Sequence, residues 1–408
     1  MIATDPLPDV PTPAGAQPTL ADELERAQAL SVQGFDDDVI AALTAALACD
    51  RARGLADSSV QRALALALIA QSLTRQGRYA DAVDAYASAP RELSGPGHVE
   101  ARIRILLGMA FACTHRALPE QALKMADAAL RLALAHDVLP LAAASLECVG
   151  IGYAMQGDLP RADRLMLEGL GLALQCNDDA VLHHCLNNLL FLSQTQFDVR
   201  RDAGDIDGAR TALGRCSRFV ARGDRLASRV GAYEHCRWRS NRAGWQLRRG
   251  NPQDAREAFI EVERDARACG WPVLVAFAQV DLAGLHVEDG RDADALAVLD
   301  DVLNAGPSID QYELRMRAHR LAQDILIGQG RPVDASAHRL AYLRLDRERA
   351  AKRARTARWL PQLGDAVLEA LLDADRARRE GDLEVLQARR AEAHAIAFLS
   401  SDAINLPD

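Results

Sequence analysis

The sequence predicts an all-α protein in which about eight antiparallel helix pairs stack into a solenoid. Three observations support this prediction. The chain has 408 residues, which exceeds the roughly 250–300 residues at which a single compact core stops growing. Hydrophobic residues make up 49% of the chain but aromatic residues only 4%, which favours closely packed helices over a β-sandwich. A turn signal also recurs along the chain at a nearly constant interval.

The recurring signal is a glycine followed five positions later by a small residue. The glycines are Gly34, Gly77, Gly157, Gly204, Gly250, Gly290 and Gly330, and their partners are Val39, Ala82, Ala162, Ala209, Ala255, Ala295 and Ala335. One further copy has Ala117 in the glycine position and Ala122 as its partner. From Ala82 onward the small residues are 40, 40, 47, 46, 40 and 40 positions apart.

Each part of this signal has a physical role. Glycine adopts the left-handed conformation that ends a helix, and a following Asp, Asn or Pro begins the next one. The small residue allows two antiparallel helices to approach closely. Because one helix pair cannot bury its apolar stripe alone, neighbouring pairs must stack. The two longer intervals predict helices about two turns longer at 182–249, and we expect this irregular centre to be functional.

The repeat resembles the tetratricopeptide family. The copy that starts at Ala143 carries the family pattern best, with Leu146, Val149, Gly150, Tyr153, Gly157, Ala162 and Met166 in the expected places. The resemblance covers residues 20–345 and implies a right-handed superhelix. The period of about 40 instead of 34 implies longer helices, as in the sensory repeats of bacterial regulators. We therefore expect a disordered Pro-rich leader at 1–18, a solenoid at 19–345 and a helical extension at 346–408.

In that family, the first helix of each pair lines a concave groove that binds a protein or peptide. Carried onto this chain, and with the shared helix face of His184 and Asn188, this implies a set of groove residues: Arg104, Glu147, His184, Asn188, Gln194, Asp198, Arg237, Asn241, Arg317 and Arg320. Arg237 and Asn241 lie four positions apart on one face and resemble part of the carboxylate clamp of chaperone-binding members. The alternative interpretation is that these residues are ordinary solvated polar side chains.

Chemical sites are not indicated by the sequence. No catalytic motif, cofactor-binding loop or metal-ligand spacing is present, so we expect no enzyme activity, no cofactor and no metal. His183, His184 and Cys185 are adjacent, and adjacent helical side chains point about 100° apart, so they do not converge on one ion. Trp238 and Trp245 lie seven positions apart among arginines, which suits packing against the next repeat better than base stacking.

Net charge, cysteine content and hydropathy limit the kinds of partner and the cellular location that we expect. The net charge is −9, which argues against nucleic acid as the main partner. Eight cysteines without a C-x-x-C pair fit a reducing cytoplasm, and we expect a cytoplasmic protein. The most apolar window, Val138 to Met155, contains Pro140 and Glu147, so we expect a buried helix there and no membrane span.

The C-terminal extension differs in character from the repeats. Seven basic residues fall between Arg344 and Arg358, and apolar residues at near-heptad spacing follow. The runs His338–Tyr342 and Asp346–Arg349 resemble the charged helix that follows such repeats in bacterial diguanylate cyclases, although no G-G-D/E-E-F string is present.

Three functions therefore remain open at this stage. The first is a sensory or adaptor protein that binds a peptide, protein segment or small signal and relays it through its C-terminal helix, which could also form a homodimer. The second is the regulatory region, or a degenerate relative, of a diguanylate cyclase. The third is a transcriptional regulator whose basic helix contacts DNA.

Overall fold

A computed structural model describes residues 18–53, 59–89, 98–115, 118–305 and 312–357. Within these ranges the chain forms sixteen α-helices and no β-strand, so the predicted all-α solenoid is confirmed. The predicted leader at 1–18 and the part of the extension beyond Ala357 lie outside the described residues, apart from Pro18. The predicted boundary between residues 345 and 346 falls inside the last helix, which runs on without a break to Ala357.

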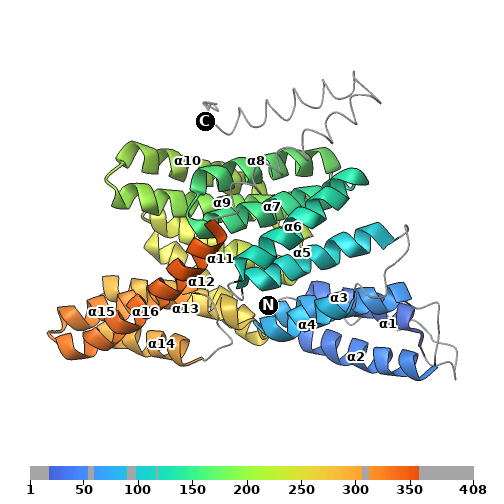
Figure 1. Ribbon diagram of the computed structural model, residues 1–408. Coiled ribbons are helices and arrows are strands. Elements are labelled where there is room, and N and C mark those ends of the chain that lie inside the picture. Colours follow the sequence, from blue (N-terminus) through green and yellow to red (C-terminus); the bar gives the residue numbers. More distant parts are fainter. Residues whose placement is uncertain (1–17, 54–58, 90–97, 116–117, 306–311, 358–408) are drawn as a thin grey trace, which may run out of the picture.

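The helices form eight successive antiparallel pairs (Figure 1). The first four pairs are α1 (Leu20–Gln33) with α2 (Asp36–Arg53), α3 (Ser59–Arg75) with α4 (Tyr79–Ser88), α5 (Val99–His115) with α6 (Pro119–Ala135), and α7 (Leu139–Gln156) with α8 (Leu159–Cys176). The last four are α9 (Asp179–Asp202) with α10 (Ile206–Gly223), α11 (Ala232–Arg248) with α12 (Pro252–Ala268), α13 (Pro272–Glu288) with α14 (Asp292–Asn304), and α15 (Tyr312–Gly328) with α16 (Pro332–Ala357).

The turn signal read from the sequence has the predicted geometry. All seven glycines of the signal have positive φ angles, between 70° and 91°. Each small partner residue is at most 4% exposed, including Ala122 of the divergent copy. Ala117 lies outside the described residues. The residue after the glycine also acts as expected where it is aspartate, since the side chain of Asp205 accepts a hydrogen bond of 2.9 Å from the backbone N–H of Gly208.

The irregular centre is only partly as predicted. Helix α9 has 24 residues, whereas most of the other helices have 17 or 18, and this accounts for the interval of 47. Helices α10 and α11 have 18 and 17 residues, so the prediction of longer helices is wrong for them. The interval of 46 instead arises from the connection after α10, which contains the 3-10 turn η4 (Ala227–Arg229).

The first helices of the pairs lie on the inner side of the solenoid. Each odd-numbered helix from α1 to α13 contacts the next odd-numbered helix, whereas successive even-numbered helices in the described ranges make no comparable contacts with each other. The odd-numbered helices therefore follow the shorter, inner path. The winding also brings α1 back against α11, so that the N-terminal helices lie beside those around α13 (Figure 1). Helix α16 reaches across from the last pair and contacts α6.

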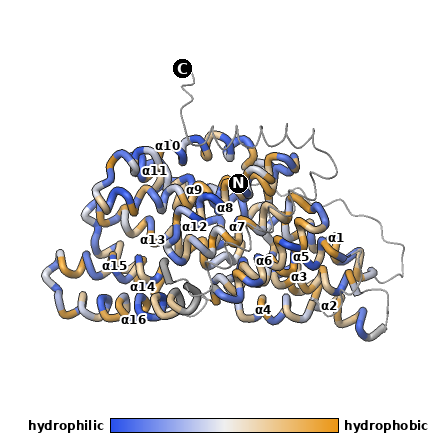
Figure 2. Tube along the Cα trace, turned by 45° about the horizontal axis from the view of Figure 1, so that its top comes forward, coloured by the Kyte–Doolittle hydropathy of each residue, from blue (hydrophilic) through white to orange (hydrophobic). Residues whose placement is uncertain are grey.

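The apolar interior is divided along the solenoid. The largest cluster of buried apolar residues spans α5 to α11, a second spans α1 to α5, a third joins α11 to α13, and a fourth joins α13 to α15. Hydrophobic and hydrophilic residues alternate along the helices, as expected when each helix buries one stripe (Figure 2). None of the helices in the described ranges has the length and apolarity needed to cross a membrane.

Candidate partner-binding surface

Seven of the ten predicted groove residues belong to two hydrogen-bonded clusters, which lie next to each other along the inner helices α9 and α11 and reach α7. The two clusters also include three residues outside the predicted set. We call the whole set the inner-face network: Glu147, His184, Asn187, Asn188, Gln194, Asp198, Glu234, Arg237, Asn241 and Arg248.

The first part of the network centres on Asn188. Its amide nitrogen donates to Oε2 of Glu147 at 3.1 Å and also lies 3.1 Å from Nε2 of His184. Its amide oxygen accepts a hydrogen bond of 3.2 Å from the guanidinium of Arg237. Arg237 in turn donates to Glu234 at 2.9 Å. One asparagine therefore ties together three consecutive inner helices.

Two carboxyl groups in this part have opposite protonation behaviour. Burial raises the pKa of Glu147 to about 8, although hydrogen bonds from Asn188 and Cys185 oppose this shift, so Glu147 is largely neutral at pH 7. Burial also acts to raise the pKa of Glu234, but the positive charge of Arg237, with smaller contributions from His184 and Arg75, outweighs it. The pKa of Glu234 is therefore held well below its usual range, and Glu234 is ionised.

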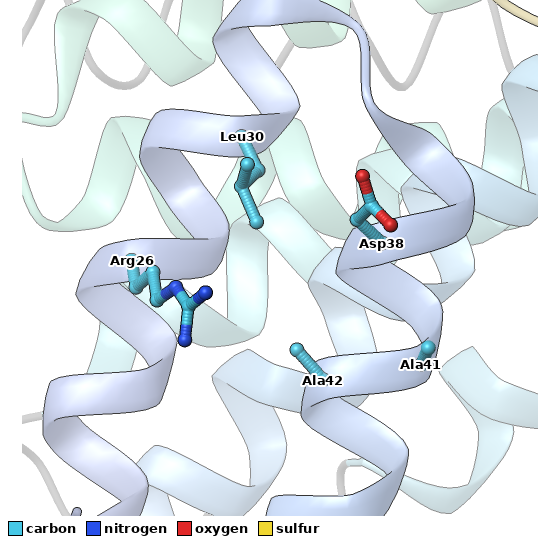
Figure 3. Close-up of a pocket in the computed structure, with 5 residues that line it drawn as sticks. All are labelled: Arg26, Leu30, Asp38, Ala41 and Ala42. Carbon is cyan, nitrogen blue, oxygen red and sulfur yellow. The ribbon is translucent and has the colours of Figure 1, made fainter. Parts of the chain in front are cut away.

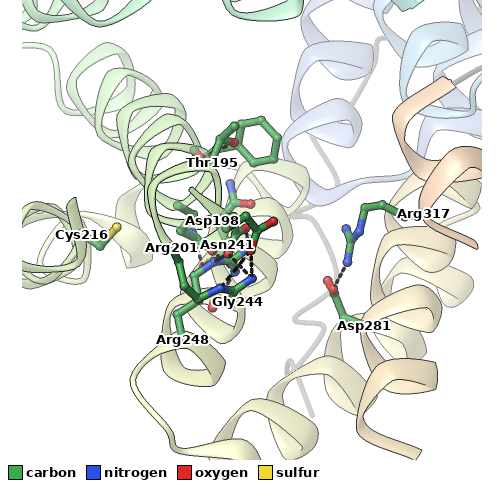
Figure 4. A network of polar contacts seen from close by, with 12 residues as sticks. Thr195, Asp198, Arg201, Cys216, Asn241, Gly244, Arg248, Asp281 and Arg317 are labelled. Carbon is green, nitrogen blue, oxygen red and sulfur yellow. Dashed lines mark hydrogen bonds and ion pairs between the residues drawn. The ribbon is translucent and has the colours of Figure 1, made fainter. Parts of the chain in front are cut away.

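The second part of the network centres on Arg248 (Figure 4). The side chain of Asn241 donates to Oδ1 of Asn187 at 2.9 Å, and Gln194 donates to the backbone oxygen of Asn241 at 3.0 Å. Arg248 donates to Oε1 of Gln194 at 2.8 Å and forms an ion pair with Asp198, with 3.2 Å between Nε and Oδ1. These bonds also join α9 to α11.

Close packing of Gln194 against α11 depends on a glycine. A Cβ atom at Gly244 would lie 2.6 Å from Oε1 of Gln194, which is shorter than such contacts allow. The absence of a side chain at Gly244 therefore lets the glutamine reach the backbone of Asn241.

The network has a buried layer and an accessible layer. Glu147, Asn187, Asn188 and Gln194 are at most 6% exposed. The remaining members are partly exposed: His184, Asp198, Glu234, Arg237, Asn241 and Arg248. In the accessible layer each ionised carboxylate is paired with an arginine, and Asn241 offers an amide. Such a surface presents hydrogen-bonding groups with little net charge.

Three predicted groove residues lie apart from the network. Arg104 on α5 is exposed and pairs with Glu100 one turn earlier at 3.1 Å. Arg317 on α15 pairs with Asp281 on α13, separately from the Arg248 cluster (Figure 4). Arg320 is exposed on α15. The structure therefore brings seven of the ten predicted groove residues close together and leaves these three apart, and the role of all ten in binding stays a prediction.

The other residues singled out from the sequence have structural surroundings. His183 is buried, and its ring lies 5.0 Å from that of Trp238. The Trp238 indole donates to Asp224 at 2.9 Å, and the Trp245 indole donates to Ser217 at 3.3 Å. Both tryptophans therefore pack on or beside α10 of the preceding helix pair, so the prediction that they pack against the next repeat is wrong. Among the described residues, no group of three or more His, Cys, Asp or Glu side chains could hold a metal ion. All eight cysteines lie in the described ranges, and none of them forms a disulfide.

A separate hollow lies between α1 and α2 (Figure 3). It is lined by Arg26, Leu30, Asp38, Ala41 and Ala42. Only two of these residues are polar, and neither is buried. A binding site needs several polar groups that converge on one place. The inner-face network meets this requirement and the hollow does not.

Comparison with known proteins supports the fold. No family model matches the chain, and no curated protein matches it. Among solved structures, the chain is similar to a Rap protein complexed with competence and sporulation factor, with a TM-score of 0.55, 11% sequence identity, and coverage of 83% of this chain and 90% of that one. At this identity the likeness shows the fold alone, and the chain has a tetratricopeptide-like helical repeat fold. The comparisons do not support the resemblance to diguanylate cyclases, which stays a prediction.

Sequence reasoning missed three members of the network. Arg248 lies seven positions after Asn241, and Glu234 lies three positions before Arg237, so helical spacing placed both on the right face. Asn187 was adjacent to a predicted residue. The sequence did not show which side chain on a neighbouring helix forms a hydrogen bond with each of these three residues.

Proposed function

We propose that the protein is a non-catalytic adaptor that binds a peptide or protein segment along the inner-face network. The observation that carries this proposal is the accessible layer of the network, which continues over two consecutive inner helices above a buried layer of amides. Buried amides hold the accessible side chains in fixed positions, and fixed positions lower the entropic cost of binding.

The balance of charge favours a peptide main chain as the ligand. The guanidinium of Arg237 is already bonded to Glu234 and Asn188. A ligand carboxylate would therefore have to displace Glu234. An extended main chain instead offers alternating donors and acceptors that suit amides and paired charges. We propose that an internal segment of the partner binds here, in preference to the terminal carboxylate that the clamp resemblance implied.

The fold neighbour supports partner binding by a protein of this fold, since that Rap protein is complexed with competence and sporulation factor. We further propose that binding is relayed through α16, which links the last helix pair to α6 and carries basic residues from Arg344 onward. A partner that moved the inner helices would change this contact. A role in bacterial signal transduction would follow from such a relay.

A selected peptide tests the proposal directly. A library of random peptides is selected on the full chain, and the affinity of the best binder is measured by fluorescence anisotropy. We expect Arg237→Ala combined with Asn241→Ala to weaken binding at least tenfold. Arg210→Ala, which removes an exposed arginine from the outer helix α10, should leave the affinity unchanged.

The main-chain component has its own test. Methylation of single backbone nitrogens in the selected peptide removes one donor at a time without changing side chains. We expect a stretch of positions at which methylation lowers affinity more than tenfold. Uniform tolerance of methylation, or equal loss in the Arg210→Ala control, would rule out main-chain recognition by this surface.

A further inference from the structure

The first helix pair meets the start of the seventh pair in a contact between residues 235 positions apart. Trp271, the residue that precedes α13, donates its indole N–H to Oδ2 of Asp36 at 2.8 Å. Asp36 is the first residue of α2 and is only 1% exposed. Arg75, the last residue of α3, lies 3.3 Å from Oδ1 of the same carboxylate and donates to the backbone oxygen of Ser31 at 3.0 Å.

The backbone and the aromatic rings fit closely around this carboxylate. A Cβ atom at Gly34, whose φ is 91°, would lie 2.8 Å from Cζ2 of Trp271, so only glycine leaves room for the indole. The ring of Tyr233 on α11 meets the Trp271 ring edge-on, with centroids 5.1 Å apart. The guanidinium of Arg75 lies 5.2 Å from the centroid of the Tyr233 ring. We call Asp36, Arg75, Tyr233 and Trp271 the clasp.

The clasp joins two apolar clusters without merging them. The cluster of α1 to α5 and the cluster of α11 to α13 share no residue. Contact between these two parts is made by the clasp and by α1 against α11, where Gly231 lies beside the backbone of Val32. Separation would expose the Trp271 indole, at the edge of the α11–α13 cluster, and would leave the remainder of both apolar clusters packed. A contact this limited can open and close while the helix pairs stay folded.

The clasp and the inner-face network share one turn of α11. Tyr233 of the clasp precedes Glu234 of the network, and Arg237 follows one turn later. The charge of Arg75 also contributes to the lowered pKa of Glu234. Movement of the first two helix pairs away from α11 would therefore change the surroundings of Glu234 in the accessible layer.

We propose that the clasp opens and closes the ring of helix pairs and that the open state exposes the α11 side of the inner-face network. The control of partner access rests on the proposed function, whereas opening itself requires nothing beyond this chain.

Opening is measured on the full chain without any partner. We compare the wild type with Asp36→Ala by small-angle X-ray scattering and hydrogen exchange, and we use Asp38→Ala as the control because it removes an exposed acid from the same helix turn. Circular dichroism confirms that the variants are equally helical. We expect a larger radius of gyration for Asp36→Ala and at least tenfold faster exchange in the first turns of α2 and α11, with α7 and α8 unchanged. Scattering and exchange equal to those of Asp38→Ala would overturn the proposal.

An engineered disulfide distinguishes opening of the clasp from a local disturbance caused by the Asp36→Ala substitution. A Cβ atom at Gly231 would lie 3.6 Å from Cα of Val32, so the two backbones approach closely enough to test a disulfide between Val32→Cys and Gly231→Cys. In the Asp36→Ala background, with exposed Cys49 replaced by alanine, oxidation should restore the wild-type radius of gyration and reduction should reverse it. Formation of the disulfide without any such change would count against a moving clasp.

The solvent exposure of the inner-face network is measured by the rate at which a small reagent labels it. Phenylglyoxal labels arginines, and mass spectrometry compares labelling of Arg237, whose side chain is 18% exposed, with that of Arg210, which is 75% exposed. We expect Asp36→Ala to raise the labelling rate of Arg237 several-fold and to leave Arg210 unchanged. If opening is seen but Arg237 labels at its original rate, the clasp does not control access. Peptide affinity is not used in these assays, so they can succeed when the proposed function fails.

Discussion

Asn188 on α9 donates a hydrogen bond of 3.1 Å to Glu147 on α7, and the Glu147 side chain has no access to solvent. The acceptor is a carboxyl group that is largely neutral at pH 7, because burial raises its pKa to about 8. A carboxyl group thus serves as an uncharged link between two repeats. At alkaline pH the Glu147 carboxyl group ionises, and the link between the two repeats becomes less favourable.

Glu147→Gln should remove a pH dependence of stability. In the unfolded chain Glu147 ionises near its ordinary pKa of 4.5, whereas in the folded protein it ionises near 8. As pH rises between these values, the folded state retains a proton that the unfolded state has lost, so the wild type loses stability. Glutamine keeps an oxygen to accept from Asn188, so we expect the variant to be more stable than the wild type by at least about 1 kcal/mol at pH 8 and by less at pH 5. Thermal unfolding from pH 5 to 8.5 measures the difference, with exposed Glu168→Gln as the control.

His183→Phe should reduce sensitivity to acid. Neither ring nitrogen of His183 has a hydrogen-bond partner, and burial lowers its pKa to about 4. Because the unfolded side chain titrates near 6.5, the wild type loses stability as pH falls from 6.5 towards 4. Phenylalanine keeps the ring against Trp238 and removes both polar atoms, so we expect a gain of roughly 1 kcal/mol at pH 7 and more at pH 5. An unchanged acid limb in the melting curve would contradict this role of His183.

Two glycines in α10 should respond in opposite directions to alanine. Nothing lies within 4 Å of a Cβ atom at Gly214, so Gly214→Ala should raise the free energy of unfolding by roughly 0.5–1 kcal/mol through helix propensity. At Gly223 a Cβ atom would lie 2.1 Å from Cη2 of Trp238, so Gly223→Ala should lower it by roughly 1–3 kcal/mol. Urea unfolding of both variants provides the measurement. A stabilising effect at Gly223 would mean that Trp238 can move away without cost.

Arg248→Met should weaken the connection between α9 and α11. It removes the ion pair with Asp198 and the bond to Gln194, and both groups then lose a charged partner. We expect a loss of roughly 1–3 kcal/mol in urea unfolding. The control is Arg249→Met, since Arg249 is exposed and lies 4.7 Å from the Trp245 ring, an arrangement worth about 1 kcal/mol or less. Equal losses in the two variants would show that Arg248 acts only through its methylene groups.

The sequence was sufficient for the repeat but not for the way repeats meet. Gly157 and Ala162 reveal a helix end and a close helix contact, because both requirements are local to the chain. Spacing also placed Arg237 and Asn241 on one helix face. Their partners Asn188 and Asn187 lie on another helix, and the choice of partner depends on the superhelical rise, which no local pattern contains.

The ends of the predicted set show the same limit. Arg317 occupies the same repeat position as the network residues, yet it pairs with Asp281 on α13, a helix whose residues are mostly apolar. The helix dipole favours the three acidic residues at the start of α2, and this local effect accounts for their location. Only the structure shows that Asp36 is bonded to Trp271, since nothing in a sequence connects positions 235 apart.

The closing contact also sets an order of events during synthesis. Most helices can pack against a neighbour as soon as the next one has left the ribosome, because their contacts are local in sequence. Asp36 must wait for Trp271, and at about 5–20 residues per second the 235 intervening positions take roughly 10–50 seconds to translate. During that interval the Asp36 carboxylate, which is buried in the complete protein, lacks its hydrogen-bond donor Trp271. The N-terminal helices are therefore open to chaperones or early partners before the ring can close.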